Sequence, residues 1–223
     1  DDIIDNSDLR RGKTTVNVAW SNSHGVLIGD FIYSKAFMLM NEIGNFKVID
    51  ELSSATNKIA EGELMQLANK NNLNTSLQQL KKISYYKTGR LFEASAKSAA
   101  MLSGKSIPFI ENISKAAKLI GIAFQVRDDL LDYGVSKGNI GKPEMQDILE
   151  DKITYPLYFA LKYSNKKDSS KILKKLKNKD FSIEEVADFV SSSNAFNKCN
   201  SLIQNYSNET VSYTHLRAHE TRG

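Results

Sequence analysis

The stretch FQVRDDLLDYG (residues 124–134) ends a long, largely apolar segment with a dense group of carboxylates. Its pentad DDLLD, at residues 128–132, repeats the pattern of DDIID at residues 1–5. In an α-helix, positions i, i+1 and i+4 fall within about 100° of arc, so each pentad predicts three aspartates on one helix face. With 14 aspartates in 223 residues, a random order gives about 0.05 such matches. Two copies therefore indicate a functional motif.

The carboxylates of each pentad would repel one another in the absence of cations. Two unit charges about 4 Å apart repel by roughly 4 kcal/mol at an effective dielectric of 20. All-oxygen ligands favour a hard ion, and Mg²⁺ typically uses one or two carboxylates together with substrate phosphates. A solvated acidic helix face explains either pentad alone, but it poorly explains two pentads accompanied by basic residues. We therefore predict Mg²⁺ as the cofactor.

The rest of the chain predicts a single all-helical domain. Hydrophobic residues make up 41% of the chain and charged residues 25%, which is typical of a soluble globular protein. Gly89 interrupts one long helical segment, where a kink could turn side chains inward. We expect the chain to begin within a helix at the first pentad and to form a loop over residues 134–152. Apolar residues recur at helical spacing over residues 26–40, 46–69, 75–102, 107–133, 153–163, 169–177, 183–191 and about 195–206.

Charge and cysteine content exclude several classes of protein. The net charge of +4 comes from scattered basic residues, so no nucleic-acid-binding surface is indicated. No stretch approaches the roughly 18 uninterrupted apolar residues of a transmembrane helix. Cys199 is the only cysteine, which excludes an internal disulfide and fits a reducing compartment. We therefore expect a cytoplasmic protein.

Basic residues near the pentads predict a polyanionic ligand. Guanidinium groups suit bidentate contacts to phosphate, and lysines add positive point charges. Each lysine alone is typical of a surface residue, but its place beside the acidic motifs favours phosphate binding. Gln125 lies on the face of the second pentad, where it either binds a ligand or pairs with a neighbouring helix. The other candidates are Arg10 and Arg11 after the first pentad, Lys87 and Thr88 before Gly89, and Lys142 and Lys152 around the loop.

These motifs stand in an order that resembles the trans-isoprenyl diphosphate synthases, also called polyprenyl synthetases, of the long-chain type. The matching segments are DDIIDNSDLRRGKTTVN, VLIGDFIYSKAF, EGELMQLA, YYKTGRLFEAS, FQVRDDLLDYG and GKPEMQDILEDKITYPL. The resemblance implies an all-α, isoprenoid-synthase-type helical bundle around a deep central cavity, usually in a homodimer. It also implies a prenyltransferase that condenses isopentenyl diphosphate with an allylic diphosphate of the geranyl or farnesyl type, giving a trans-polyprenyl diphosphate. Long products would bring peripheral membrane contact.

The resemblance assigns a role to each candidate residue. Thr88 and Gln125 would stabilise the allylic cation or orient the substrate, and Arg11 would contact isopentenyl diphosphate. The allylic diphosphate would be bound by Lys87, Lys142 and Lys152, with Arg10 nearby. The Mg²⁺ ligands would be Asp1, Asp2, Asp5, Asp128, Asp129 and Asp132.

Two other functions stay open: a non-catalytic subunit of a heteromeric prenyl synthase, and a class I terpene cyclase. Such subunits usually lose acids from a motif, and cyclases usually carry an Asn/Asp-Ser/Thr-Glu type second motif, so the six aspartates favour the synthase. The family often has Gly-Asp where this chain has Met145–Gln146. We expect residues 1–210 to form a polyprenyl synthetase domain that lacks its N-terminal helices, and we expect the 223-residue chain by itself to be weakly active or inactive. Residues 211–223 resemble translated adaptor sequence and are expected to be a non-native tail.

Overall fold

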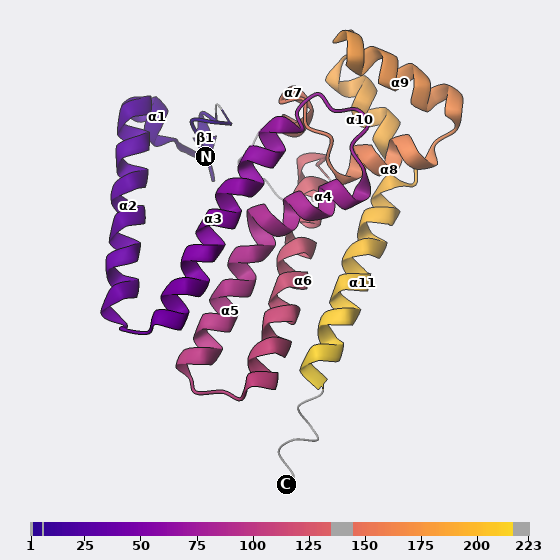
Figure 1. Ribbon diagram of the computed structural model, residues 1–223. Coiled ribbons are helices and arrows are strands. Elements are labelled where there is room, and N and C mark those ends of the chain that lie inside the picture. Colours follow the sequence, from indigo (N-terminus) through magenta and orange to yellow (C-terminus); the bar gives the residue numbers. More distant parts are fainter. Residues whose placement is uncertain (1, 6, 135–144, 216–223) are drawn as a thin grey trace.

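The computed structural model describes residues 2–5, 7–134 and 145–215, with side chains described up to residue 214. Within these ranges the chain is almost entirely helical, which confirms the predicted all-α class (Figure 1). The elements are β1 (Leu9–Arg10), β2 (Lys13–Thr14), α1 (Val16–Ala19), α2 (Asn22–Glu42), α3 (Phe46–Ala68), α4 (Leu77–Ser84), the π-helix η1 (Tyr85–Gly89), α5 (Arg90–Leu102), α6 (Ile107–Asp132), α7 (Gln146–Leu149), α8 (Tyr155–Tyr163), α9 (Lys166–Asn178), α10 (Ile183–Ser192) and α11 (Ala195–His215).

Helix α6 is the centre of the structure and carries the second pentad at its C-terminal end. It lies between α5 and α11, which run alongside it (Figure 1). Val126 and Leu130, one helical turn apart on α6, are fully buried in the core with side chains from α8, α10 and α11. Asp129 precedes Leu130 and shares its buried side of the helix, whereas Asp128 is exposed. Core packing on one side of α6 therefore buries Asp129 and leaves the adjacent Asp128 exposed.

Helix α2 lies at the outer edge of the structure, where its close contacts with other described elements are with α1 and part of α3, and Ile3 lies against Gly25 (Figure 1). None of its described residues is buried. Leu27, Phe31 and Ile32 are 66%, 71% and 62% exposed. The apolar pattern that predicts this helix therefore gives it a large uncovered apolar surface.

The N-terminal region differs from the expected helix. Residues 2–5 form turns, and the backbone N–H of Ser7 donates to the Asp2 carbonyl at 2.8 Å. The first turn of a helix fixes the backbone of several residues and gains only one hydrogen bond. A segment of this length is too short to offset that loss of conformational entropy. A two-stranded hairpin follows, in which Leu9 pairs with Thr14 and Arg10 with Lys13.

The remaining differences concern where helices begin, end or break. The short helix α7 lies in the segment expected to be a loop, and α11 continues to residue 215 instead of ending near 206. The segment 75–102 is not one α-helix, because η1 separates α4 from α5 and the two helices run in different directions (Figure 1). A π-helical turn is a known cause of such kinks. It ends at Gly89, the residue that the sequence singles out.

No helix within the described ranges combines the length and the apolar character that crossing a bilayer requires.

Candidate active site

The hairpin after the first pentad brings a guanidinium back to that pentad. Arg11 and Gly12 form its two-residue turn with φ of 54° and 74°, as a type I′ turn requires. The turn returns the chain beside β1, on which Arg10 lies. The Arg10 Nε and Nη2 atoms lie 2.8 and 2.5 Å from Asp2 Oδ1. The Arg11 residue, at the tip of the turn, is exposed.

Lys152 connects the first pentad with the C-terminal part of the site. Its Nζ lies 3.3 Å from Asp5 Oδ1 and 2.5 Å from Glu150 Oε2. Burial lowers the pKa of Lys152, but Glu150, Asp5 and Asp147 outweigh burial and keep that pKa above its usual value. Burial likewise raises the pKa of Asp5, but the charges of Lys152, Lys87 and Arg10 hold it below the usual range. Lys152 and Asp5 are therefore both ionised at neutral pH.

A chain of hydrogen bonds joins η1, α6 and α8. Thr88 Oγ1 donates to Gln125 Oε1 at 2.8 Å, and Gln125 Nε2 donates to Asp129 Oδ1 at 3.0 Å. The other carboxylate oxygen of Asp129 accepts from the backbone N–H of Tyr155 at 3.2 Å. Tyr155 is the first residue of α8, so a carboxylate stands at the positive end of that helix.

The three aspartates of the second pentad have different environments. Asp128 is exposed, and Asp129 is only 6% exposed. Asp132 accepts backbone hydrogen bonds from Gln146 at 3.0 Å and Asp147 at 3.1 Å, which fixes the start of α7. Burial raises the pKa of Asp129 to about 7, with a further contribution from the negative charges of Asp128 and Asp132 that its hydrogen bonds only partly offset.

Met145, just before α7, stands at a position where the family often has glycine. Its backbone is left-handed, with φ of 62°. Glycine adopts this conformation without a steric penalty, so the family's Gly-Asp is suited to this position. In this chain the Met145 side chain is buried in the core instead.

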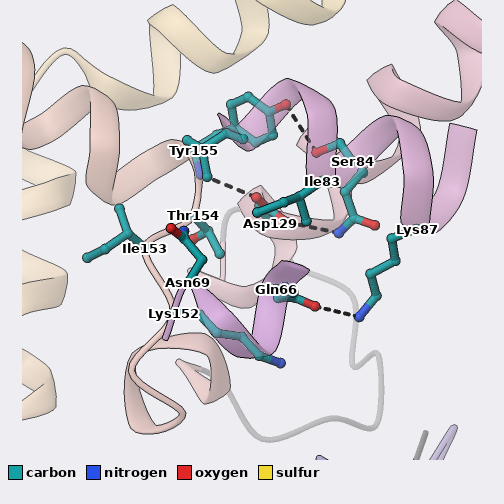
Figure 2. Close-up of a pocket in the computed structure, with 12 residues that line it drawn as sticks. Gln66, Asn69, Ile83, Ser84, Lys87, Asp129, Lys152, Ile153, Thr154 and Tyr155 are labelled. Carbon is teal, nitrogen blue, oxygen red and sulfur yellow. Dashed lines mark hydrogen bonds between the residues drawn. The ribbon is translucent and has the colours of Figure 1, made fainter. Parts of the chain in front are cut away.

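Lys87, in η1, reaches the same pocket from the opposite side to Lys152. Its Nζ lies 3.0 Å from Glu63 Oε2 and 2.8 Å from Gln66 Oε1, both on α3. Figure 2 shows Lys87 and Lys152 extending from different elements, with Asp129 above them in this view. The pocket that they line together measures about 30 Å³, which is large enough for water and too small for a prenyl group. It forms the polar floor of the site.

Several residues that line the pocket or contact its lysines are not among the predicted candidates. Glu63 and Gln66 lie one turn apart in EGELMQLA, and this polar pair near the end of an apolar helix is the signal that could have identified them. Tyr155 and Ser84, whose hydroxyl oxygens lie 3.1 Å apart in the interior, left no local signal because they are 71 residues apart in the chain. The candidates Asp1 and Lys142 lie outside the described residues.

The residues around the pocket fit a divalent cation. Asp128 is exposed, and Asp129 and Asp132 lie within one turn of it on α6, so carboxylate oxygens are close together there. Within the described ranges, no three acidic side chains are arranged to hold a metal ion by themselves. An ion here would complete its coordination with water or with phosphate oxygens, as Mg²⁺ commonly does.

Apolar side chains form a wall along the exposed side of α6 that leads to the second pentad. Phe124 and Ile120 lie one and two turns before Asp128 on the same exposed side of the helix, and they are 56% and 47% exposed. The ring of Phe92, on α5, lies 5.7 Å from that of Phe124. A ligand with a charged head and an apolar tail would match this order of side chains.

Comparison with known proteins finds one family. The profile described as polyprenyl synthetase matches residues 1–192. The octaprenyl diphosphate synthase of Escherichia coli (strain K12) is 40% identical over 172 residues, which cover 77% of this chain and 53% of that protein. The all-trans-nonaprenyl-diphosphate synthase (geranyl-diphosphate specific) of Rhodobacter capsulatus is 36% identical over 200 residues, or 89% of this chain and 61% of that protein.

Solved structures agree with this result. The crystal structure of a polyprenyl synthase from Caulobacter crescentus CB15, complexed with calcium and isoprenyl diphosphate, has a TM-score of 0.90 and 30% identity over 96% of this chain and 66% of that one. The chain spans about half the length of the octaprenyl diphosphate synthases that it matches. Because the family profile covers most of the chain, the chain belongs to the polyprenyl synthetase family.

Proposed function

We propose that the chain forms the diphosphate-binding part of a prenyltransferase. In this reaction, isopentenyl diphosphate condenses with an allylic diphosphate of the geranyl or farnesyl type to give a trans-polyprenyl diphosphate. The single observation that carries the proposal is the placement of Lys87 and Lys152 around one pocket, with Asp5 and Asp129 beside them and an apolar wall leading away. The long-chain synthases among the relatives support this class of product.

The basic residues would stabilise the departing diphosphate. As the allylic C–O bond breaks, negative charge develops on the diphosphate, and the ammonium groups of Lys87 and Lys152 are positioned to neutralise it. Arg10 contributes a guanidinium beside the first pentad. Lys142 and Arg11 are assigned to diphosphate contacts by the resemblance alone. A bound divalent cation would supply further positive charge to the leaving group.

Thr88 and Gln125 would act on the organic part of the substrate. The Gln125 carbonyl oxygen accepts from Thr88, and Gln125 lies one turn from Asp129, so its partial negative charge would stabilise an allylic cation formed beside it. The double bond of isopentenyl diphosphate then attacks that cation, and loss of a proton to the released diphosphate restores an alkene. No side-chain base is needed for this step.

We assign Mg²⁺ to the two pentads. The Caulobacter structure contains calcium and isoprenyl diphosphate, which supports a divalent cation in this family. Of the second pentad, Asp128 is the residue best able to reach an ion, because it is exposed. Asp129 and Asp132 accept hydrogen bonds from the protein, and their direct ligation, like that of Asp1, Asp2 and Asp5, stays a prediction.

We also propose that a second copy of the chain covers α2. This helix has only three charged residues among its 21, and large apolar side chains along it are exposed. A two-fold interface brings the same surface together with itself, so a low charge density avoids repulsion. Sedimentation should find a dimer that Phe31→Asp dissociates; a wild-type chain that stays monomeric would contradict the assignment.

A cytoplasmic location is supported by Cys199, a buried thiol without a second cysteine.

The function is tested by binding and turnover together. The purified chain is titrated with an unreactive thiolo analogue of farnesyl diphosphate plus Mg²⁺, and is then incubated with radiolabelled isopentenyl diphosphate and farnesyl diphosphate. We expect Mg²⁺-dependent binding and only weak formation of extended prenyl products, both nearly abolished by combined Asp128→Ala and Asp129→Ala. Absence of both binding and turnover in the wild type would contradict the proposal, as would their persistence in the double variant. A cyclic hydrocarbon product would favour the terpene cyclase instead.

A further inference from the structure

The π-helical turn η1 supplies two residues of the site and needs an explanation for its stability. A π-turn contains one residue more than an α-turn, so side chains beyond it are rotated by about 100° relative to an uninterrupted α-helix. This rotation directs Lys87 to Glu63 and Gln66 on α3, and Thr88 to Gln125 on α6. Isolated π-turns are rare, so neighbouring contacts have to hold η1 in this form.

Glu93 provides such a contact from the side of η1 that does not line the pocket. The phenol of Tyr85, the first residue of η1, donates to Glu93 Oε2 at 2.6 Å. The other carboxylate oxygen of Glu93 accepts from Ser114 Oγ, on α6, at 3.1 Å. Burial raises the pKa of the Tyr85 phenol, and the hydrogen bond to Glu93 raises it further, so the phenol remains a donor. The Lys118 ammonium lies 4.4 Å from the centre of the Tyr85 ring.

Arg90 extends this network to the third helix around η1. Its Nη1 lies 3.4 Å from Glu93 Oε2 and 2.5 Å from Glu51 Oε1 on α3. The side chains of Glu93, Arg90 and Glu51 are 17%, 11% and 9% exposed, so solvent screens these charges little. The start of η1 is thereby tied to α3, α5 and α6 at once.

Glycines hold the same turn by close packing. A Cβ placed at Gly62, on α3, would come within 2.7 Å of the Lys87 backbone nitrogen. A Cβ at Gly121, on α6, would come within 2.6 Å of the Gly89 Cα. Packing alone brings the helices together but does not select a π-turn over an α-turn. The hydrogen bond from Tyr85 to Glu93 has a defined direction and can make that selection.

We propose that Tyr85 and Glu93 are positioning residues, which keep η1 in its π-helical form so that Lys87 faces the diphosphate and Thr88 faces Gln125. Neither Tyr85 nor Glu93 lines the pocket. Their effect on the ligand is therefore exerted through Lys87 and Thr88. The identity of the ligand as a diphosphate rests on the proposed function, whereas the control of the η1 conformation does not.

The variants that test the pair change as little else as possible. Tyr85→Phe keeps the ring and removes the donor, and Glu93→Leu removes the acceptor. Glu93→Gln keeps an oxygen that can accept from Tyr85 and an amide that can donate to Ser114, so it is the conservative rescue. Tyr86→Phe is the matched control, because Lys58 and Lys82 contact the Tyr86 ring, which phenylalanine retains.

The first measurement is calorimetric binding of inorganic diphosphate with Mg²⁺ at a temperature where every variant is folded by circular dichroism. Tyr85→Phe and Glu93→Leu are expected to weaken binding about tenfold, and Glu93→Gln and Tyr86→Phe less than threefold. In a Lys87→Ala background, Tyr85→Phe should cause a much smaller further loss, because the shared route through Lys87 is already removed. Fully additive losses, or wild-type affinity in Tyr85→Phe, would overturn the proposal.

The second measurement needs no ligand. Hydrogen exchange at the amides of residues 85–90 should accelerate at least tenfold in Tyr85→Phe, while exchange at residues 116–122 of α6 stays unchanged. If the wild type does not bind diphosphate, the proposed function fails and exchange alone decides whether the pair holds η1. Unchanged exchange at residues 85–90, or equal acceleration throughout α6, would show a role in general stability and would reject positioning.

Discussion

The Cα of Gly89 occupies the space that a side chain at Gly121 would need: a Cβ built at Gly121 lies only 2.6 Å from it. The contact joins the end of η1 to the middle of α6. One turn further along α6 lies Gln125, which Thr88 reaches at 2.8 Å. The close approach of two glycine backbones is thus what allows η1 and α6 to share a hydrogen bond in the site.

Gly121→Ala is expected to destabilise the chain by about 3 kcal/mol, near the upper end for overpacked sites, because the added Cβ meets backbone that cannot move aside cheaply. Urea unfolding measures this loss. Gly29→Ala, measured at a concentration where the chain is monomeric, is the matched control: Gly29 lies in α2 with nothing within 4 Å of an added Cβ. That change should stabilise the chain by roughly 0.5–1 kcal/mol through helix propensity. Equal effects at the two glycines would contradict the close approach.

The buried hydroxyl pair of Tyr155 and Ser84 should show energetic coupling. Tyr155→Phe leaves the Ser84 hydroxyl without this partner and is expected to cost about 1–3 kcal/mol. Ser84→Ala should cost a similar amount, and the double variant less than the sum of the two. A double-mutant cycle from denaturant unfolding gives the coupling energy, expected between 0.5 and 3 kcal/mol. A coupling energy of zero would show that the hydroxyl groups do not interact in solution.

The ionised side chain of Glu51 should contribute to folding stability, and acid should remove this contribution. Burial raises the pKa of Glu51, but the hydrogen bonds from Lys97 and Arg90 outweigh burial and hold that pKa below the usual 4.5. A carboxylate with a lowered folded-state pKa contributes its full stability above the unfolded value. This contribution is lost as pH falls below 4.5 and through the folded-state pKa.

Glu51→Gln should therefore cost about 3 kcal/mol at pH 7, because Arg90 loses its buried partner. The difference from wild type should shrink steadily as the pH is lowered from 4.5 to 2.5 in denaturant titrations. Glu61→Gln, at the exposed pair with Lys58, is the control and should change stability little at any pH. A difference for Glu51→Gln that is constant with pH would show that its charge is not responsible.

Ligand-induced stabilisation should require the metal ion and the diphosphate together. At 100 times its dissociation constant, Mg²⁺-diphosphate is expected to stabilise the chain by about 2.7 kcal/mol, whereas either component alone should do little. A chelator should reverse the effect. Asp128→Asn should remove most of it, and Asp188→Asn, an exposed acid on α10, should retain it. Full stabilisation of Asp128→Asn, or by diphosphate without metal, would contradict a metal site at the second pentad.

Much of the architecture can be predicted from the sequence because helical periodicity is a local property. The segments 46–69, 107–133 and 183–191 each match an observed helix to within one residue at either end. The first pentad does not follow its pattern, because the short described segment of residues 2–5 cannot support a helix by itself. Arg10 lies beside the pentad only because Arg11 and Gly12 adopt the left-handed conformations of a hairpin turn.

The amino-acid sequence by itself determined the chemistry of the chain: two carboxylate clusters, basic residues placed near them along the chain, and the polyprenyl synthetase motifs. Residue types and their spacings are properties of the linear sequence. Only the tertiary structure decided which aspartate is exposed, since the burial of Asp129 and the exposure of Asp128 depend on what packs against α6. It also decided that Lys152 meets Asp5 across 147 residues, and that Gly62 and Gly121 confine η1. These features arise from contacts between segments that are distant in the sequence, so local periodicity cannot predict them.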